Sequence, residues 1–302
     1  MVAIHLNKTV DDIFSGYSKL ETPDEKIEHK VDGSLICNDF EDLMKQYETF
    51  LVWEVYLKEV KDILTPEQIN SFLQATIRYD DYKHYRCNTG HFITRLIQNS
   101  HNAGNNKFIL NTKALSKKID CIAHSLKGKK DMLLEIIVDG NLGDYCGLRA
   151  ENIEKIYICG NVGRRCGENV QNIGKLYISG DAGNYCCERA KSIKELYIGG
   201  NAGNACGYKA ENIGKIYIGR DAGANCAWDA KNIGKLHIAG NVGSDCGFGA
   251  ENSTFKTPNK ETLRLLKKNV PIGEGNKIYS IQPNGKEKRI GRLMEILNYR
   301  LW

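Results

Sequence analysis

The sequence lacks the long apolar segments that a membrane-spanning helix requires. No hydrophobic run approaches the ~18 residues that cross a bilayer, and the first residues, MVAIHLNKTVDDIF, contain no basic region followed by an apolar core. We therefore expect a cytoplasmic protein without a membrane partner.

The short motifs that identify common active sites are also missing. The chain has no glycine-rich phosphate-binding loop after a strand, no nucleophile elbow and no metalloprotease helix. His84, Cys87 and His91 could bind a metal by residue type, but their spacing matches no recognised zinc motif and a fourth ligand is missing. We therefore predict no catalytic residue, no cofactor and no metal site, which favours a non-enzymatic protein.

Charge of one sign is not in large excess, and the cysteines do not suggest a secreted disulfide framework. Lys and Arg number 42 against 37 Asp and Glu, a net charge of +5 that permits an acidic partner without requiring one. The 11 cysteines are odd in number, and six of them belong to a repeat. Reduced thiols are the expectation, with intracellular disulfides of the kind found in hyperthermophiles as the open alternative.

What the chain does contain is a strict 20-residue repeat between residues 133 and 251. A period of this length is typical of a solenoid, whose coils bury their apolar faces only by stacking. Each coil has two or three glycines and no ten-residue periodic run, which argues against helical repeats. The sequence predicts a mainly β protein with a parallel β-helix of about six coils, each with three short strands and three corners. One coil shows the apolar positions: Ile153, Ile156, Ile158, Val162, Cys166 and Val170.

The segments on either side of the solenoid domain, residues 116–254, are predicted to cover its ends. An uncovered terminal coil would expose a bare strand edge. In the N-terminal helical domain, residues 1–115, we expect helices over 39–64, from Thr65 to about 79, and from Asn88 or Thr89 to about 102, then a strand over 107–111. In the C-terminal cap, residues 255–302, we expect a helix begun by Asn259, a hairpin of strands 277–281 and 286–290, and a final helix to Trp302.

Two columns of repeated residues are explained by stacking. One cysteine per coil at ~4.8 Å intervals forms a line, whereas a metal needs converging ligands, so we predict that these thiols fill the core. Neighbouring Cα atoms at that spacing fall within the range of a disulfide, which leaves the redox state open. The cysteine column is Cys146, Cys166, Cys186, Cys206, Cys226 and Cys246.

A corner column of Asn and Asp is predicted to form a hydrogen-bonded ladder. Asp181 and Asp221 do not fit a pair of glycosidase carboxylates, because they are two coils, or ~10 Å, apart with an Asn between them. The column is Asn141, Asn161, Asp181, Asn201, Asp221 and Asn241.

Outward positions on the repeated strand carry the residues that we predict to bind a partner. An aromatic column ends in a histidine, and a basic column runs beside it, interrupted by Glu195. The two columns are Tyr157, Tyr177, Tyr197, Tyr217 and His237, and Lys155, Lys175, Lys215 and Lys235. Three interpretations are open: the helix over residues 39–64, ~39 Å long, covers this face; the face anchors a protein partner; or it stacks nucleic-acid bases and follows their phosphates.

Strings such as IYICGNVGRRCGENVQNIGKLYISGDAGNYC and IYIGRDAGANCAWDAKNIGKLHIAGNVGSDCG resemble two glycine-rich β-helices. These are the C-terminal domain of the glutamate synthase large subunit and the β-helical subunit of formylmethanofuran dehydrogenase. The resemblance covers about residues 133–250. It implies a right-handed β-helix that serves as scaffold and interface in a larger assembly, with catalysis carried elsewhere and no catalytic residue in this motif.

Together these observations favour a non-catalytic scaffold or binding protein that engages a protein partner. An accessory subunit of a metabolic enzyme complex and a nucleic-acid-binding protein are the alternatives, and the oligomeric state stays open.

Overall fold

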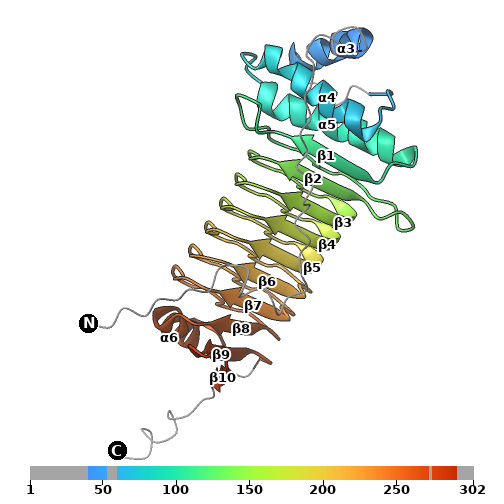
Figure 1. The fold of residues 1–302 in the computed structure, drawn as a ribbon. Helices are drawn as coiled ribbons and strands as arrows, with labels where there is room; N and C mark the ends of the chain where they lie inside the picture. Colours follow the sequence, from blue (N-terminus) through green and yellow to red (C-terminus); the bar gives the residue numbers. More distant parts are fainter. Residues whose placement is uncertain (1–39, 53–59, 272–273, 291–302) are drawn as a thin grey trace, which may run out of the picture. The chain divides into compact units, whose positions relative to one another are not determined.

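The computed structural model describes residues 40–52, 60–271 and 274–290, all within one compact unit, Leu35–Trp302. These residues form a ten-stranded sheet whose strands are neighbours in chain order, with helices near either end (Figure 1). The strands are β1 (Lys107–Asn111), β2 (Glu135–Asp139), β3 (Glu151–Ile158), β4 (Gln171–Ile178), β5 (Lys191–Ile198), β6 (Lys215–Ile218), β7 (Lys235–Ile238), β8 (Thr254–Thr257), β9 (Lys277–Ile281) and β10 (Glu287–Ile290).

The sheet is one wall of a parallel β-solenoid of about seven turns, which confirms the predicted fold class. Each strand from β3 to β6 pairs in parallel with the next strand, and paired residues are 20 positions apart, as are Tyr157 and Tyr177. The parallel ladder begins at β1 and continues to β9, and only β9 and β10 are antiparallel. The stack therefore extends beyond the coils that the regular repeat reveals.

Each coil has one strand, so the prediction of three strands per coil is wrong. Outside that strand, neighbouring coils are joined by single parallel bridges such as Val162 with Ala182. The reason lies in the backbone: in one coil Arg165, Gly167 and Asn169 have φ values of 60°, 67° and 54°. Left-handed residues at alternate positions interrupt an extended chain, and they turn it back toward the start of the next strand.

The solenoid core consists of the predicted apolar positions. Ile156 and Ile158 are 6% and 0% exposed, whereas Tyr157 between them is half-buried on the outer face, as strand alternation requires. Successive coils place equivalent side chains next to one another, and the buried residues form one cluster that continues into the N-terminal helices. A side chain in this core is therefore packed mainly by its own counterparts.

The N-terminal helices are α3 (Glu41–Val52), α4 (Pro66–Ala75), the 3₁₀ helix η1 (Thr76–Tyr79) and α5 (Tyr85–Asn102). The predicted start at Thr65 is confirmed, because Gln68 N–H donates to the Thr65 hydroxyl and Thr65 N–H donates to the Gln68 side chain. The helix expected over 39–64 is wrong at its end, since residues 60–65 are not helical; residues 53–59 lie outside the described part. The third helix begins earlier than expected, with His84 as N-cap.

Helices α4 and α5 cover the first coil. Asn111, at the end of β1, donates its N–H to the Asn70 side chain at 2.8 Å and accepts from Gln74 at 2.6 Å. Helix α5 lies against the segment after β1, where an added Cβ on Gly90 would come within 1.7 Å of the Asp120 carbonyl oxygen. The open edge of β1 is therefore protected from pairing with another chain.

The other end is covered by α6 (Lys260–Asn269) and the β9–β10 hairpin. Asn259 caps α6, as predicted, by accepting from Thr262 N–H at 2.9 Å, and the Thr262 hydroxyl donates to the Gly240 carbonyl of the last coil. The predicted final helix to Trp302 lies outside the described residues. Among the described helices, none combines the length and apolarity needed to traverse a membrane.

Candidate functional site

The outward tyrosines form a continuous stack, which we call the tyrosine column. Ring centroids from Tyr157 to Tyr177, Tyr197 and Tyr217 are separated by 4.5, 4.3 and 5.1 Å, with ring planes within 11° of parallel. His237 continues the column 4.9 Å beyond Tyr217, at 18°. The rings are half-buried by one another. Burial raises the pKa of Tyr157 and Tyr197, so their hydroxyls stay protonated at neutral pH.

A basic column lies two residues before the tyrosine column on the same face. Lys155, Lys175, Glu195, Lys215 and Lys235 are cross-strand neighbours in successive coils. Lys215 Nζ lies 2.9 Å from a Glu195 carboxylate oxygen, and Lys155 Nζ lies 5.8 Å from the centre of the Tyr157 ring. We call this set, without Glu195, the lysine column; its four cations outnumber the single carboxylate and give the face a positive charge.

Stacking determines what the tyrosine column can offer a ligand. The two faces of each inner ring are occupied by the neighbouring rings, so a ligand cannot stack on these rings. A nucleic-acid base stacks on an aromatic face. Because the ring faces are already occupied, the tyrosine column offers nucleic-acid bases no aromatic surface on which to stack, and this argues against the nucleic-acid interpretation.

The interpretation that the first helix covers this face does not hold for its described part. Helix α3 packs on α5, and none of the strands from β3 to β7 is among the elements it packs against. Its apolar side faces a cluster of aromatic rings, in which Tyr47 meets Phe72 and Phe92 at centroid distances of 5.6 and 5.2 Å. Helix α3 thus packs on the helices that cover the first coil.

His237 differs chemically from the tyrosines that it continues. Its burial lowers its pKa from 6.5 to about 4, and the nearby Lys235 and Lys256 act in the same direction, while Glu287 opposes them. At neutral pH the imidazole is therefore uncharged, and it stacks as an aromatic ring on Tyr217.

The cysteine column lies in the core and does not converge on any point. Its six members are 0–2% exposed and none of them is in a disulfide. The backbone register keeps them one coil apart, as shown by the Cys187 N–H that donates to the Cys166 carbonyl. Burial raises the pKa of Cys146, so it is a neutral thiol that packs as an apolar group.

The Asn/Asp column forms the predicted ladder. The Asn161 side chain accepts the N–H of Asp181 at 2.7 Å, and Asp181 in turn accepts the N–H of Asn201 at 2.6 Å. The same contact recurs at the other steps, and Asn241 ends the row by accepting from Asn259 at 3.1 Å. These side chains satisfy backbone donors at a corner, and Asp181 and Asp221 are thereby engaged in structure.

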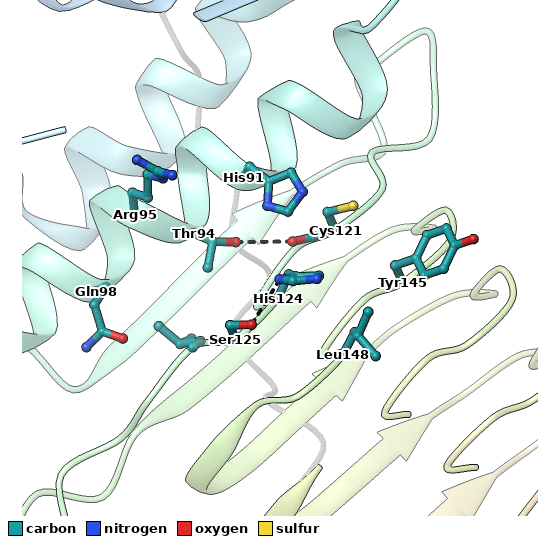
Figure 2. Close-up of a pocket in the computed structure, with 10 residues that line it drawn as sticks. His91, Thr94, Arg95, Gln98, Cys121, His124, Ser125, Tyr145 and Leu148 are labelled. Atoms are coloured by element: carbon teal, nitrogen blue, oxygen red, sulfur yellow. Dashed lines mark hydrogen bonds between the residues drawn. The ribbon is translucent and has the colours of Figure 1, made fainter. Parts of the chain in front are cut away.

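A second candidate site, which sequence reasoning missed, lies between α5 and the first coil. A cavity of about 600 Å³ opens there, and we call it the junction pocket. Figure 2 shows His91 of α5 facing Cys121 and His124 of the coil, with Tyr145 at the rim. The two imidazole rings meet edge to face with their centroids 4.8 Å apart.

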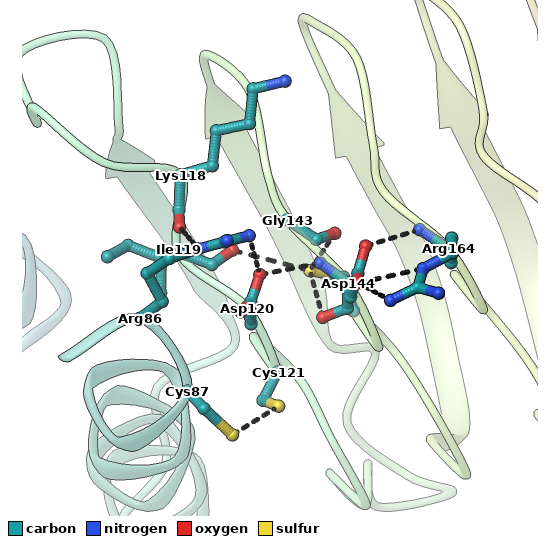
Figure 3. A network of polar contacts seen from close by, with 10 residues as sticks. Arg86, Cys87, Lys118, Ile119, Asp120, Cys121, Gly143, Asp144 and Arg164 are labelled. Carbon is teal, nitrogen blue, oxygen red and sulfur yellow. Dashed lines mark hydrogen bonds and ion pairs between the residues drawn. The ribbon is translucent and has the colours of Figure 1, made fainter. Parts of the chain in front are cut away.

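Two cysteines meet beside the junction pocket. Cys87 Sγ of α5 lies 3.1 Å from Cys121 Sγ (Figure 3), well beyond the ~2.05 Å of a disulfide bond. The ligand atoms of Cys87, His91 and Cys121 all lie within 4.8 Å of one another. Two effects raise the pKa of the Cys121 thiol: the contact with Cys87, which is the larger, and burial.

A network of charged groups fixes the coil segment that carries Cys121. Arg86 donates to the Lys118 carbonyl at 2.9 Å and to the Asp120 carboxylate at 2.7 Å. The same Asp120 oxygen accepts the Asp144 N–H at 2.8 Å, and Asp144 pairs with Arg164 at 3.0 Å in the next coil (Figure 3). Burial raises the pKa of Asp120, while the Asp144 N–H and Arg86 oppose the shift.

The sequence offered His84, Cys87 and His91 as possible metal ligands by residue type, and the structure brings only two of them together. Cys87 and His91, four residues apart on one face of α5, come together, whereas His84 is the N-cap of that helix and is not part of the group. Cys121 and His124 were missed because they lie in a different segment. The signal available in the sequence was a pair of spacings, Cys-x₃-His at 87–91 and Cys-x₂-His at 121–124.

No protein-family model matches this chain, and neither a curated protein nor a solved structure matches it significantly.

Proposed function

We propose that the protein is a non-catalytic scaffold that binds a protein partner through its tyrosine and lysine columns. The observation that supports this most directly is a stacked aromatic and basic face that extends over five coils. Among the described residues, no helix packs on strands β3 to β7. An aromatic surface of this extent is typical of an interaction site.

The chemistry of the face favours a partner with an acidic surface. Lysines occupy four of the five positions in their column, and the hydroxyls of Tyr157 and Tyr197 stay protonated, which is the form that donates hydrogen bonds to carboxylates. The ring edges carry partial positive charge, which adds to this preference. We also propose a cytoplasmic setting, because the thiols of the cysteine column are not oxidised and reduced thiols persist in that compartment.

The test is a pull-down from native lysate with quantitative mass spectrometry, after nuclease treatment. The variant Lys175→Glu, Lys215→Glu reverses the charge of the binding face, and Lys260→Glu, Lys267→Glu makes the same change on α6 as a matched control. We expect a partner recovered with the unmodified chain to be lost with the first variant and retained with the control.

A second variant separates the hydroxyls from the ring stack. Tyr177→Phe, Tyr197→Phe and Tyr217→Phe together keep the rings but remove three hydroxyls, and should weaken binding. The proposal is contradicted if the lysine-column variant and the tyrosine-column variant both recover as much of the partner as the unmodified chain does. A parallel pull-down omits the nuclease. If the material recovered there disappears after nuclease treatment, and if binding falls steeply as salt is raised, the partner is nucleic acid instead. Recovery of a redox or transferase subunit would narrow the role to that of an accessory subunit.

A further inference from the structure

The four side chains at the junction pocket are of the types that bind zinc. Cys87 and His91 come from α5, and Cys121 and His124 come from the first coil. Two thiolates and two imidazoles are a set that Zn²⁺ binds in closed, four-coordinate structural sites. We infer that Cys87, His91, Cys121 and His124 form a structural zinc site that fastens α5 to the solenoid.

The distances fit this assignment after a small adjustment. In a tetrahedral site with zinc–sulfur bonds of ~2.3 Å, the two sulfurs are ~3.8 Å apart. Cys87 Sγ and Cys121 Sγ are 3.1 Å apart, so they need to separate by roughly 0.7 Å to admit the ion. His91 is already in reach, because its ligand atom and the two sulfurs all lie within 4.8 Å of one another.

His124 is placed to supply the fourth ligand. Its ring touches that of His91, with a centroid distance of 4.8 Å. Its Nδ1 is 3.1 Å from the Ser125 hydroxyl, which leaves Nε2 for the metal, and a hydrogen bond to the other ring nitrogen is typical of metal-binding histidines. His124 lies outside the group of ligand atoms within 4.8 Å of one another, so its half-buried side chain must turn toward the other three residues to complete the tetrahedron.

The surroundings hold the ligands in position in the way that metal sites require. Gly90 lies between the two ligands of α5, and its missing side chain allows the helix to approach the backbone at Asp120. The Thr94 hydroxyl accepts the N–H of Ala123 at 2.9 Å and lies 3.3 Å from the Cys121 carbonyl oxygen. Arg86 holds the carboxylate of Asp120, directly before Cys121, at 2.7 Å.

Zinc binding at this site converts two thiols to thiolates and releases their two protons. The ion then joins segments whose cysteines are 34 positions apart in the chain. Because the site exists only in the folded protein, bound zinc adds to the stability of this end of the solenoid. This role is independent of the tyrosine and lysine columns.

The test uses the full-length protein, purified under reducing conditions without chelator. We expect about one zinc ion per chain by elemental analysis, and, after removal of zinc, binding of Co²⁺ with the visible absorption of a tetrahedral thiolate site. Cys87→Ser should lower Zn²⁺ affinity by more than ~100-fold, since even outer-shell changes cause 10- to 100-fold losses. His124→Ala should also weaken binding, and Cys159→Ser, which alters a half-buried thiol elsewhere, should leave it unchanged.

A chelator provides a readout that does not depend on variants. It should lower the melting temperature of the unmodified protein and of Cys159→Ser, and leave that of Cys87→Ser unchanged. The proposal is overturned if the reduced, unmodified protein binds neither Zn²⁺ nor Co²⁺, or if peptide mapping finds Cys87 and Cys121 joined by a disulfide in the reduced preparation. Full Zn²⁺ affinity in His124→Ala would remove that residue from the site.

Discussion

Replacing Gly90 with alanine tests how closely α5 approaches the first coil. In an exposed helix this change alone would be stabilising by up to ~1 kcal/mol. Here the added Cβ would lie 1.7 Å from the Asp120 carbonyl oxygen, whereas real Cβ atoms essentially never come closer than 3.0 Å. The helix or the coil segment must therefore move by at least 3.0 − 1.7 = 1.3 Å, and the sign of the stability change shows which effect is larger.

A movement of this size removes the two contacts that the Thr94 hydroxyl makes with the coil, with the Ala123 N–H and the Cys121 carbonyl, and leaves its contact with the Gly90 carbonyl within the helix. Each buried hydrogen bond contributes ~1 kcal/mol, and the loosened packing adds ~1 kcal/mol or more. Against a helix gain of ~1 kcal/mol, we expect Gly90→Ala to lower the free energy of unfolding by about 2 kcal/mol.

The measurement is urea denaturation followed by circular dichroism. Asn102→Ala, at an exposed position of the same helix, removes only an exposed side-chain contact with Gln98 and should stay within ~0.5 kcal/mol of the unmodified protein. If Gly90→Ala is as stable as the unmodified protein or more so, α5 does not approach the coil this closely, and the geometry of the junction pocket is wrong.

Three further predictions concern the solenoid. The side chain of Ile198 is 0% exposed. Ile198→Ala should lower the free energy of unfolding by ~2–5 kcal/mol, and Ile198→Val by only ~0.5–1.5 kcal/mol. Equal losses for the two variants in denaturation curves would contradict a tightly stacked core. Asp181→Ala leaves the Asn201 N–H without its acceptor and should lower the free energy of unfolding by ~1–2 kcal/mol. Asp181→Asn keeps an acceptor and should be nearly neutral. Similar losses for both variants would show that the hydrogen-bonded ladder is not the cause of the destabilisation. The pKa of His237 is lowered from 6.5 to about 4, so the unfolded chain takes up its proton first and stability falls as pH drops through this window, by at most ~3 kcal/mol. His237→Tyr should therefore be the more acid-stable protein in melts from pH 7 to pH 4, and identical pH profiles would refute the assigned environment.

The repeat made the solenoid predictable because its constraints are local and recur in every coil. Once Tyr157 and Tyr177 are assigned to equivalent positions, the ring stack follows from strand register alone. The coil corners were less accessible, because left-handed residues such as Arg165 and Asn169 carry no sequence signal as strong as glycine. A strand was therefore predicted where the chain turns.

The N-terminal region was harder to predict because its residues serve distant contacts. Asn88 and Thr89 are suitable cap residues in sequence, yet the Asn88 amide donates to the Phe50 carbonyl at 2.9 Å and the Thr89 hydroxyl meets the Tyr47 hydroxyl at 2.7 Å. Both are buried in α5, which begins at Tyr85. The junction pocket was missed for a similar reason: Cys121 lies outside the regular repeat, and only the fold brings it to Cys87.

The constant register between coils makes the solenoid a spacer with discrete increments. Every 20 residues of chain advance the stack by one strand spacing of ~4.8 Å. Duplication or loss of a whole coil would thus change the interval between α5 and α6 stepwise while leaving both ends intact. An insertion of one residue within a strand would instead turn its outward side chains inward. Length variation in this architecture is therefore expected to occur in whole coils.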